Sequence, residues 1–316
     1  MPPSHSIQVA PHTKEYRANE YRRRVCLAMN YISQHLDADV SLEAVAKAAS
    51  LSMFHFHRIF KAVVGETVAD YTRRLRLEWA ANQLLAVRVE PVTVIAIECG
   101  FSSSQNFAKA FKLHFGVSPS AYRKSKTGNT ERKRENVSLL VAGNNAGTGC
   151  LAQNNDERKT EVDAKIKEMP DYNVAYVRKI GPYGKEVCQR AFGELMQWAE
   201  PRGFLASGLT FAVYWDNPEV TPPERCRVDA CVVVPPGTKP EGQIGIQTIS
   251  GGRYAVCGFE ITDDGFQQAW EDAFAWLVQS GYECDDKPCY EMYLNNAEQH
   301  PEGKWVVNAC IPLKKL

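Results

Sequence analysis

The sequence lacks several features that would place it in common classes of protein. No apolar run among its 316 residues approaches the roughly 20 residues that a membrane-spanning helix needs. The opening residues, MPPSHSIQVAPHTKEYRANE, do not follow the charged, apolar, small-residue order of a secretory signal. The ten cysteines include no C-x-x-C pair, so neither a zinc site nor a disulfide framework is expected. These absences favour a cytoplasmic protein with reduced thiols and with no metal or cofactor.

Net charge is also absent from the chain as a whole, but the two halves differ. Residues 1–135 contain 20 Lys and Arg against 12 Asp and Glu, a net charge of +8. The remaining residues contain 17 against 25, a net charge of −8. A basic half joined to an acidic half suggests two separate tasks, one of them on a polyanion.

The pattern along the chain divides it into four parts. Residues 1–20 are expected to be a disordered extension, and residues 21–126 a series of helices. Residues 127–160 are rich in Gly, Asn, Thr and charge, a composition that cannot bury a core and indicates a linker. Residues 161–316 alternate β-like runs with two helical segments. The predicted fold is therefore an all-α domain followed by an α+β domain.

Each half contains an internal repeat. In the helical half, FHRIFKAVVGETVADYTR (56–73) matches FAKAFKLHFGVSPSAYRK (107–124) in residue type at an offset of 51. In the second half, YWDNP (214–218) matches YLNNA (293–297) at an offset of 79. The segments that support this second duplication further are DACVV with NACIP, offset by 79, and AFGELMQWAEPRGF with AWEDAFAWLVQSGY, offset by 78.

The first repeat has the pattern of a helix-turn-helix unit. In residues 40–65, Ser41 is expected to cap a short helix and Ser52 a second one, whose Phe56 and Phe60 face inward. In the second copy, the expected turn is Cys99–Gly100–Phe101 with a cap at Ser102. Residues 68–87 have the length of a helix that connects the two units.

This arrangement resembles the AraC/XylS family of transcription regulators, whose DNA-binding domain is two such units on one linking helix. The resemblance covers about residues 21–126 and is most specific in IAIECGFSSSQNFAKAFKLHFGVSPSAYR. It implies binding to double-stranded promoter DNA. The one departure is Ser50, where the first turn of the family often has Gly.

The candidate DNA-binding residues are those that point away from the apolar stripe of each second helix. Arg58 and Gln105 are the candidates for base contacts, since Arg pairs bidentately with guanine and Gln with adenine. Lysines in the same helices are expected on phosphates. The full set is Phe54, His57, Arg58, Lys61, Ser104, Gln105, Lys109 and Lys112, with Ala108 on the same face. The alternative is a solvated basic face on a helical bundle.

The second half resembles the GyrI-like family of effector-binding domains through PYG (182–184), CYEMYLNNAEQ (289–299) and ACIPL (309–313). The resemblance implies two pseudo-symmetric strand-helix-strand-strand units around a cleft for small amphipathic, often cationic or aromatic, molecules. It also implies a ligand-facing role for Glu291, which matches the family's recurrent Glu. The order of the two domains resembles the Rob-type subgroup of AraC regulators.

Strand alternation places Glu291 and Tyr293 on one face, and Tyr290, Met292 and Leu294 on the other. The second set suits packing beneath a helix, so Glu291 and Tyr293 are expected to face away from it. The offset of 79 adds Tyr214 to the predicted ligand site and pairs Glu291 with Ala212.

Other aromatic residues are weaker candidates or core. Tyr183 is a weaker ligand candidate, and strand alternation argues against Trp215. The helical aromatics are expected to be core; they are Phe192, Trp198, Trp270 and Phe274. The alternative for Glu291 is pairing with a neighbouring Arg or Lys.

The leading hypothesis is a transcription regulator that senses a small-molecule effector, contacts RNA polymerase, and binds DNA as a monomer rather than an obligate dimer. A rival is a GyrI-like hydrolase with Glu291 as general base, although the only His of this half is His300. A third possibility is a ligand-independent regulator whose acidic domain binds a protein partner or mimics DNA.

Overall fold

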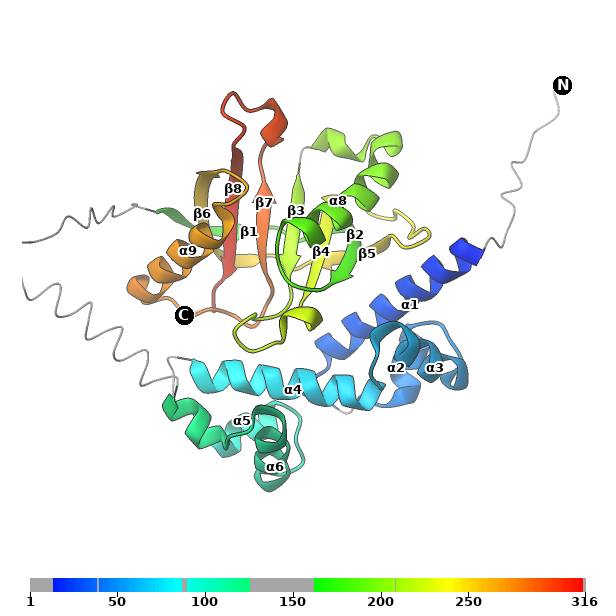
Figure 1. The fold of residues 1–316 in the computed structure, drawn as a ribbon, viewed down its shortest axis with the longest axis vertical. Helices are drawn as coiled ribbons and strands as arrows, with labels where there is room; N and C mark the ends of the chain where they lie inside the picture. The colour runs from blue at the N-terminus through cyan, green and yellow to red at the C-terminus, as the bar shows by residue number, and fades with distance from the viewer. Residues whose placement is uncertain (1–13, 39, 87–89, 126–161, 208, 315–316) are drawn as a thin grey trace, which may run out of the picture. The chain divides into compact units, whose positions relative to one another are not determined.

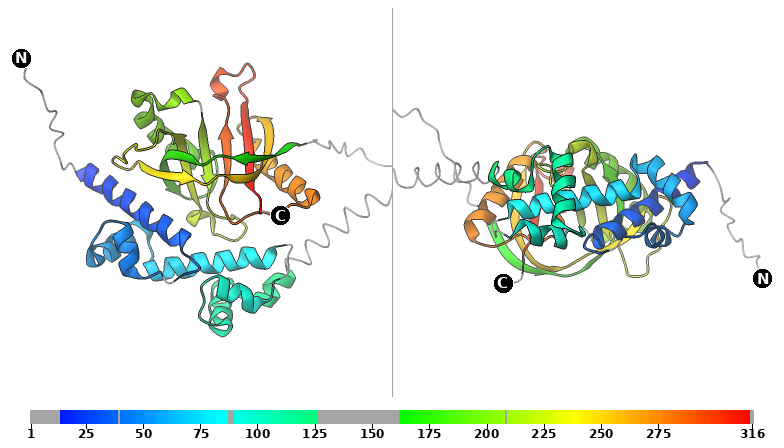
Figure 2. Two further views of the ribbon diagram at one scale, coloured as in Figure 1. Left: turned by 180° about the vertical axis from the view of Figure 1, so that it is seen from behind. Right: turned by 90° about the horizontal axis from the view of Figure 1, so that it is seen from below.

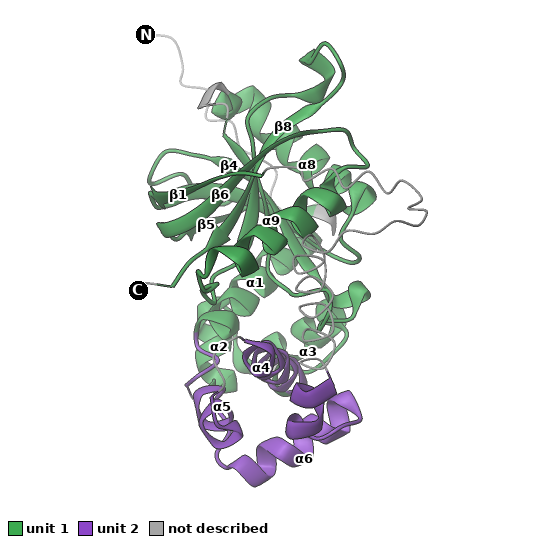
Figure 3. Ribbon diagram, turned by 90° about the vertical axis from the view of Figure 1, so that its left-hand side faces the viewer, with its two compact units in different colours: residues 1–34, 40–69, 162–316 green, residues 35–39, 70–161 purple. Residues whose placement is uncertain are grey.

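The computed structural model describes residues 14–38, 40–86, 90–125, 162–207 and 209–314. They form two compact units (Figure 3): the described residues within 1–34, 40–69 and 162–316 make unit 1, and those within 35–39 and 70–161 make unit 2. The predicted linker, 127–160, lies outside the described residues. The prediction of a disordered extension is wrong for residues 14–20, which are helical.

The helices of unit 1 begin with α1 (Lys14–Gln34), followed by α2 (Leu42–Ala48) and α3 (Met53–Val64). Ser41 caps α2 as predicted, since its side chain accepts a hydrogen bond from the Ala44 N–H. Ser52 occupies the N-cap position of α3 without a side-chain cap bond to the backbone. The rings of Phe56 and Phe60 are fully buried with their centroids 5.5 Å apart. This part of the helical half therefore has the predicted helix-turn-helix core.

The second copy lies in α5 (Val92–Glu98) and α6 (Ser104–Phe115), which follow α4 (Val68–Leu85). Phe107 and Phe111 occupy the positions of Phe56 and Phe60 and are also fully buried. The predicted cap at Ser102 is wrong by one residue: the N-cap is Ser103, whose hydroxyl accepts from the Asn106 N–H. The second turn is one residue longer than the first, because α2 and α5 are offset by 50 and α3 and α6 by 51.

The α+β region of unit 1 is one antiparallel sheet of eight strands in the order β1-β6-β8-β7-β3-β4-β2-β5. Two helices, α8 (Lys185–Ala199) and α9 (Phe266–Ser280), lie on the same face of it (Figures 1 and 2). The strands are β1 (Asp163–Met169), β2 (Tyr172–Ile180), β3 (Thr210–Tyr214), β4 (Arg227–Val233), β5 (Gly245–Ile249), β6 (Gly252–Ile261), β7 (Cys289–Tyr293) and β8 (Trp305–Pro312). Short 3₁₀ segments occur in the connections: Glu200–Arg202, Phe204–Ser207, Pro223–Arg225 and Ala297–Gln299.

The strand order has the two-fold symmetry that the sequence repeat predicts. The repeat makes β5, β6, β7 and β8 the counterparts of β1, β2, β3 and β4. When each strand is exchanged with its counterpart, the strand order is unchanged except that it runs in the opposite direction. The central strands β3 and β7 pair antiparallel, and Ala212 lies opposite its own repeat equivalent, Glu291. The pseudo-symmetry axis therefore passes between these two residues.

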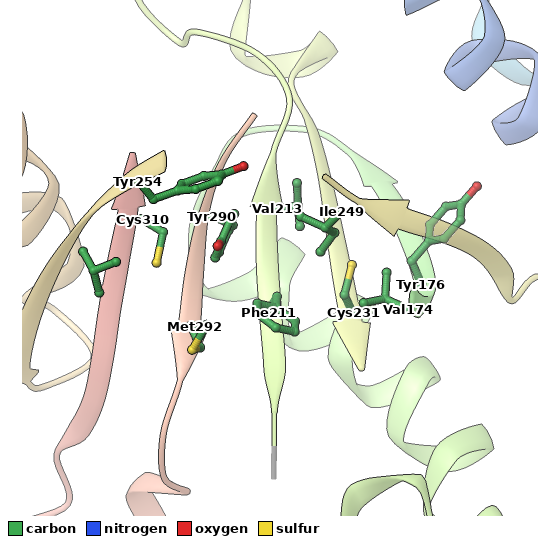
Figure 4. Packing of buried hydrophobic residues seen from close by; sticks show 11 residues of the cluster. Val174, Tyr176, Phe211, Val213, Cys231, Ile249, Tyr254, Tyr290, Met292 and Cys310 are labelled. Atoms are coloured by element: carbon green, nitrogen blue, oxygen red, sulfur yellow. The ribbon is translucent and has the colours of Figure 1, made fainter. Parts of the chain in front are cut away.

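The two faces of the sheet are both buried. On the helix face, Tyr293 packs with Val187 of α8, Ala212 and Val307. On the opposite face, Tyr290 and Met292 pack with Phe211 in a cluster that extends from Tyr254 to Tyr176 (Figure 4).

The predicted alternation of side chains is correct, but the assignment of faces is wrong. Glu291 and Tyr293 lie beneath the helices rather than away from them. Both faces bury apolar side chains, so the apolar character of Tyr290 and Met292 did not distinguish them. Leu294 follows β7 and is 47% exposed.

Candidate functional site

The carboxylate of Glu291 is buried at the centre of the helix face, with 2% of the residue exposed. Its Oε2 accepts hydrogen bonds from the hydroxyls of Tyr293 at 2.6 Å and Tyr214 at 2.9 Å. Its Oε1 accepts from the indole Nε1 of Trp270 at 2.7 Å. These four residues form the carboxylate cluster. All three donors are neutral, so the cluster gives the carboxylate three hydrogen bonds without balancing its charge.

Burial determines the protonation of the carboxylate cluster. Desolvation raises the pKa of Glu291, and the hydrogen bonds from Tyr293, Trp270 and Tyr214 oppose this shift without cancelling it. Burial, together with the adjacent Glu291 charge, raises the pKa of Tyr214 and of Tyr293 well above the usual range. Both phenols are therefore neutral donors at physiological pH.

Aromatic rings surround the carboxylate cluster from both helices. Phe192 of α8 contacts the Tyr293 ring edge-on at a centroid distance of 5.5 Å. Trp305 of β8 contacts the same ring at 5.4 Å. Trp270 of α9 lies 6.0 Å from the Tyr214 ring. Aromatic faces around a buried carboxylate suit the recognition of an organic cation.

The alternative for Glu291, pairing with a neighbouring Arg or Lys, finds no support. Within the described ranges, no Lys or Arg forms an ion pair with it, and its partners are the two phenols and the indole. Of the predicted ligand residues, the structure brings together Glu291, Tyr293 and Tyr214.

Tyr183 lies beside the carboxylate cluster but is not a member of it. Its ring contacts Tyr214 at a centroid distance of 4.9 Å. Its hydroxyl lies 3.1 Å from the backbone oxygen of Asp216 and 3.0 Å from that of Arg227, and 3.0 Å from the Asp216 N–H. Trp215 lies on the opposite face, as strand alternation predicted, where its indole donates to Asp229.

Trp270 is a site residue, although the sequence pattern predicted it to be core. The repeat contained a signal for it, since the helix offset of 78 pairs Trp270 with Phe192, and both flank the axis at Glu291. Phe274 is not core either, since it is 42% exposed. Trp198 packs against Phe204 and donates its indole N–H to Glu241.

The candidate DNA-contacting residues lie on α3 and α6. On α3, His57, Arg58 and Lys61 are exposed, while the side chain of Phe54 lies outside the described part of the structure. On α6 the exposed residues are Gln105, Lys109 and Lys112; Ser104 and Ala108 are half-buried. The helices thus present the expected polar side chains to solvent.

The turns of the two helix-turn-helix units differ at one backbone position. Gly100 has φ +78°, and Ser50 occupies the corresponding position with φ +54°. A Cβ at Gly100 would overlap the carbonyl oxygen of Leu36 and the guanidinium of Arg76. Glycine is therefore required in the second turn, and serine in the first adopts a conformation that is unfavourable for a side chain.

The described residues contain neither a membrane-spanning helix nor a cluster of metal-ligating side chains. None of the helices there combines the length and apolarity needed to span a membrane. No group of three or more His, Cys, Asp or Glu in these same residues is arranged to hold a metal ion.

Two family models match the chain. Residues 163–314 match the GyrI-like small molecule binding domain, and residues 45–125 match a helix-turn-helix domain. Among curated proteins, the chain is similar to the DNA gyrase inhibitor of Escherichia coli K12, at 35% identity over 154 residues. That match covers 48% of this chain and 96% of the relative.

Among solved structures, the chain is similar to an AraC-type transcriptional regulator from Chromobacterium violaceum, with 24% identity and a TM-score of 0.31. That match covers 33% of this chain and 91% of the other. A second similarity is to the EcmrR C-terminal domain, with 19% identity, a TM-score of 0.41, and coverage of 49% of this chain and 99% of the other.

Proposed function

Because the chain belongs to the GyrI-like family through its C-terminal half and carries an AraC-type helix-turn-helix domain in its N-terminal half, we propose that it is a transcription regulator controlled by a small organic cation. The first half binds promoter DNA, and the second binds the effector at the carboxylate cluster. The protein acts in the cytoplasm, as a monomer, and contacts RNA polymerase.

The observation that carries the effector proposal is the unbalanced charge of Glu291. Among the residues that the structure describes, this carboxylate has two phenols and an indole as partners and no counter-ion, and burial raises its pKa. A bound monocation would supply the missing charge, and its apolar groups would pack against the surrounding rings. The GyrI-like match supports a small molecule as the occupant.

Access to Glu291 requires a movement, because only 2% of the residue is exposed. Trp270 is the cover we expect to move, since it reaches the carboxylate from α9 through one hydrogen bond. The incoming cation would take the place of the Trp270 indole at the carboxylate. It would supply an attraction between opposite charges, which the neutral indole N–H cannot. Cation affinity should therefore rise with pH as Glu291 ionises, because its pKa is raised in the free protein.

The DNA-binding proposal assigns different tasks to the exposed residues of α3 and α6. Arg58 and Gln105 contact base edges, with Phe54 and His57 beside the first and Ser104 beside the second. Lys61, Lys109 and Lys112 contact phosphates. Two recognition helices on one chain would occupy adjacent major-groove segments about 34 Å apart, so one molecule can bind a non-palindromic site.

A selection from a random duplex library with the full chain tests the DNA proposal. We expect enrichment of a site with two short conserved blocks, and an affinity that falls steeply as salt rises. Equal binding of selected and random duplexes at physiological salt would refute sequence-specific binding.

Titration with tetraphenylphosphonium, an aromatic monocation, tests the effector proposal, with neutral triphenylphosphine oxide as the matched probe. The unmodified protein should prefer the cation, and Glu291→Gln should remove that preference. Gln keeps the size and shape of Glu without its charge and, like a protonated Glu, has one oxygen that only accepts hydrogen bonds. An equal effect on both probes would therefore eliminate the electrostatic role.

Hydrolysis of a small molecule is the second candidate function. The observation in its favour is that burial raises the pKa of Glu291 beside two phenols, as a general base requires. Turnover of a panel of reactive esters that is lost in Glu291→Gln would support it. Binding of the cationic probe without turnover of the panel would favour the sensor.

A further inference from the structure

The sheet face opposite α8 and α9 carries a buried polar cluster that neither the effector nor the DNA proposal uses. Asp229 of β4 is fully buried and lies in register with Arg178 of β2. The Arg178 Nε and Nη2 each lie 2.7 Å from one oxygen of this carboxylate. Trp215 and Gln247 also donate to Oδ2, at 2.8 and 2.9 Å. The geometry is that of a bidentate ion pair supported by further hydrogen bonds.

Helix α1 contributes side chains to this polar cluster. The Asn30 Oδ1 accepts from Arg178 Nη1 at 2.7 Å, and its Nδ2 donates to the Tyr176 hydroxyl at 3.3 Å. Three residues further along the helix, the Ser33 hydroxyl accepts from Arg227 Nη1 at 2.9 Å. Residues three apart share one face of a helix, so a single face of α1 is docked on the sheet through two arginines.

Arg227 links this docked face to the carboxylate cluster on the other side of the sheet. Its Nη2 and Nε lie 2.6 and 2.9 Å from the two oxygens of Asp216. Tyr183 hydrogen-bonds the backbone of both residues. The Tyr183 ring contacts Tyr214, which donates to Glu291. A continuous series of contacts therefore joins Glu291 to α1.

The series continues from α1 into the first helix-turn-helix unit. Arg24 Nη1 donates to the backbone oxygen of Ser50 at 2.6 Å. Ser50 belongs to the turn between α2 and α3, the turn with the positive φ. Arg225 Nη1 also lies 3.2 Å from Glu66 Oε2. This contact joins the connection before β4 to the residue that follows the C-cap of α3.

We propose that α1, docked through Asn30 and Ser33, transmits the state of the carboxylate cluster to the turn that orients α3. This inference rests on the proposed function for its purpose, since only a ligand-responsive regulator needs such a relay. Buried charges support a relay of this kind, because neither arginine can lose its carboxylate without finding another partner. A displacement of Tyr183 would shift Asp216 and Arg227 together, and with them the contact to Ser33.

Hydrogen–deuterium exchange of the full chain, without DNA or ligand, tests the relay. The first variant, Asn30→Ala with Ser33→Ala, should accelerate exchange of the α1 amides in residues 26–34 about fivefold. Tyr183→Phe, which removes only the relay hydroxyl, should accelerate the same amides about threefold. Glu291→Gln should change the exchange of these amides as well.

Tyr254→Phe is the matched control. It removes a tyrosine hydroxyl that donates to the backbone oxygen of Ser250, outside the contact series. It should leave the α1 amides unchanged. Retained protection of the amides in β3 and β7 verifies that each variant is folded.

Two results would overturn the inference. Unchanged α1 exchange in the Asn30/Ser33 double variant would show that α1 is not docked. Accelerated exchange in that variant, with Tyr183→Phe behaving like Tyr254→Phe, would show docking without a relay. Neither result depends on DNA or cation binding, so failure of the relay is distinguishable from failure of the proposed function.

Discussion

The two halves of the molecule are both duplicated, but they use their copies differently. In the helical half, the copies place the same kinds of side chain at equivalent exposed positions: Arg58 corresponds to Lys109 and Lys61 to Lys112. In the sheet half, the residues that meet at the pseudo-symmetry axis differ, since Ala212 lies opposite Glu291. Positive charge at equivalent positions suits a polyanion such as DNA, whereas a carboxylate on one side of the axis suits a small ligand with one charged end.

The presence of Ala rather than a second Glu at position 212 has a structural reason. Ala212 and Glu291 are paired on adjacent strands, where Cβ atoms lie about 5 Å apart. Two carboxylates at that separation in a buried site cannot both ionise without strong repulsion. With alanine at position 212, no second carboxylate faces Glu291 across this strand pair.

Restoring symmetry at the axis should produce the largest effect. We expect Ala212→Glu to lower the free energy of unfolding at pH 7 by about 3 kcal/mol more than Ala212→Gln, because only the former adds a buried charge. Urea denaturation of both variants measures this difference. It should disappear at low pH, where both carboxyls are protonated; a difference that persists there would mean that side-chain size, not charge, is responsible.

Breaking the similarity of the recognition helices should have the next largest effect. Arg58→Ala should reduce affinity for the selected duplex by about 2 kcal/mol, about 30-fold, and relax specificity at one position. Lys109→Ala should weaken binding to all duplexes by the same factor. It should also reduce the slope of log affinity against log salt by about one, the contribution of one phosphate contact. Anisotropy titrations at several salt concentrations separate the two, and a uniform loss for Arg58→Ala would reassign it to the DNA backbone.

Neutralising the carboxylate should stabilise the protein moderately. The folded-state pKa of Glu291 is raised above 4.5, so folding favours the protonated form, and this contribution is lost as pH rises through the raised value. Glu291→Gln should therefore increase the free energy of unfolding by about 1 kcal/mol above that window. Denaturation at pH 4 and pH 8 measures the change, and equal effects at both pH values would contradict a raised pKa.

Making the two turns alike should have the smallest effect. Ser50→Gly relieves a positive φ and should stabilise the protein by about 0.5–1 kcal/mol. Ser50→Ala is the control, since alanine retains the unfavourable conformation and should not stabilise. Thermal melting of the two variants side by side gives the comparison, and equal melting temperatures would show that the first turn stores no strain.

Sequence reasoning succeeded where the signal was repeated or local. The second duplication matched Ala212 to Glu291, and the symmetric sheet places these two residues opposite each other. The Ser41 cap required only local chemistry. The helicity of residues 14–20 was missed because the segment has little apolar periodicity; ion pairs from Glu20 to Arg23 and Arg24 contribute to the helix there.

Sequence reasoning failed where the answer depended on long-range packing. The face to which Glu291 points depends on what covers each side of the sheet, and both sides are apolar. The role of Trp270 depends on the position of α9 over β7. The role of Tyr183 depends on the connection that brings the backbone oxygens of Asp216 and Arg227 to its hydroxyl. The contact of Asn30 with Arg178 joins residues 148 positions apart, beyond any local pattern.

The most direct test of the account is the ratio of affinities for tetraphenylphosphonium and triphenylphosphine oxide, measured calorimetrically in the unmodified protein and in Glu291→Gln. We predict a preference for the cation of about tenfold or more in the unmodified protein, and a ratio near one in the variant. An unmodified protein that binds both probes equally, or neither, would contradict the claim that Glu291 recognises an organic cation.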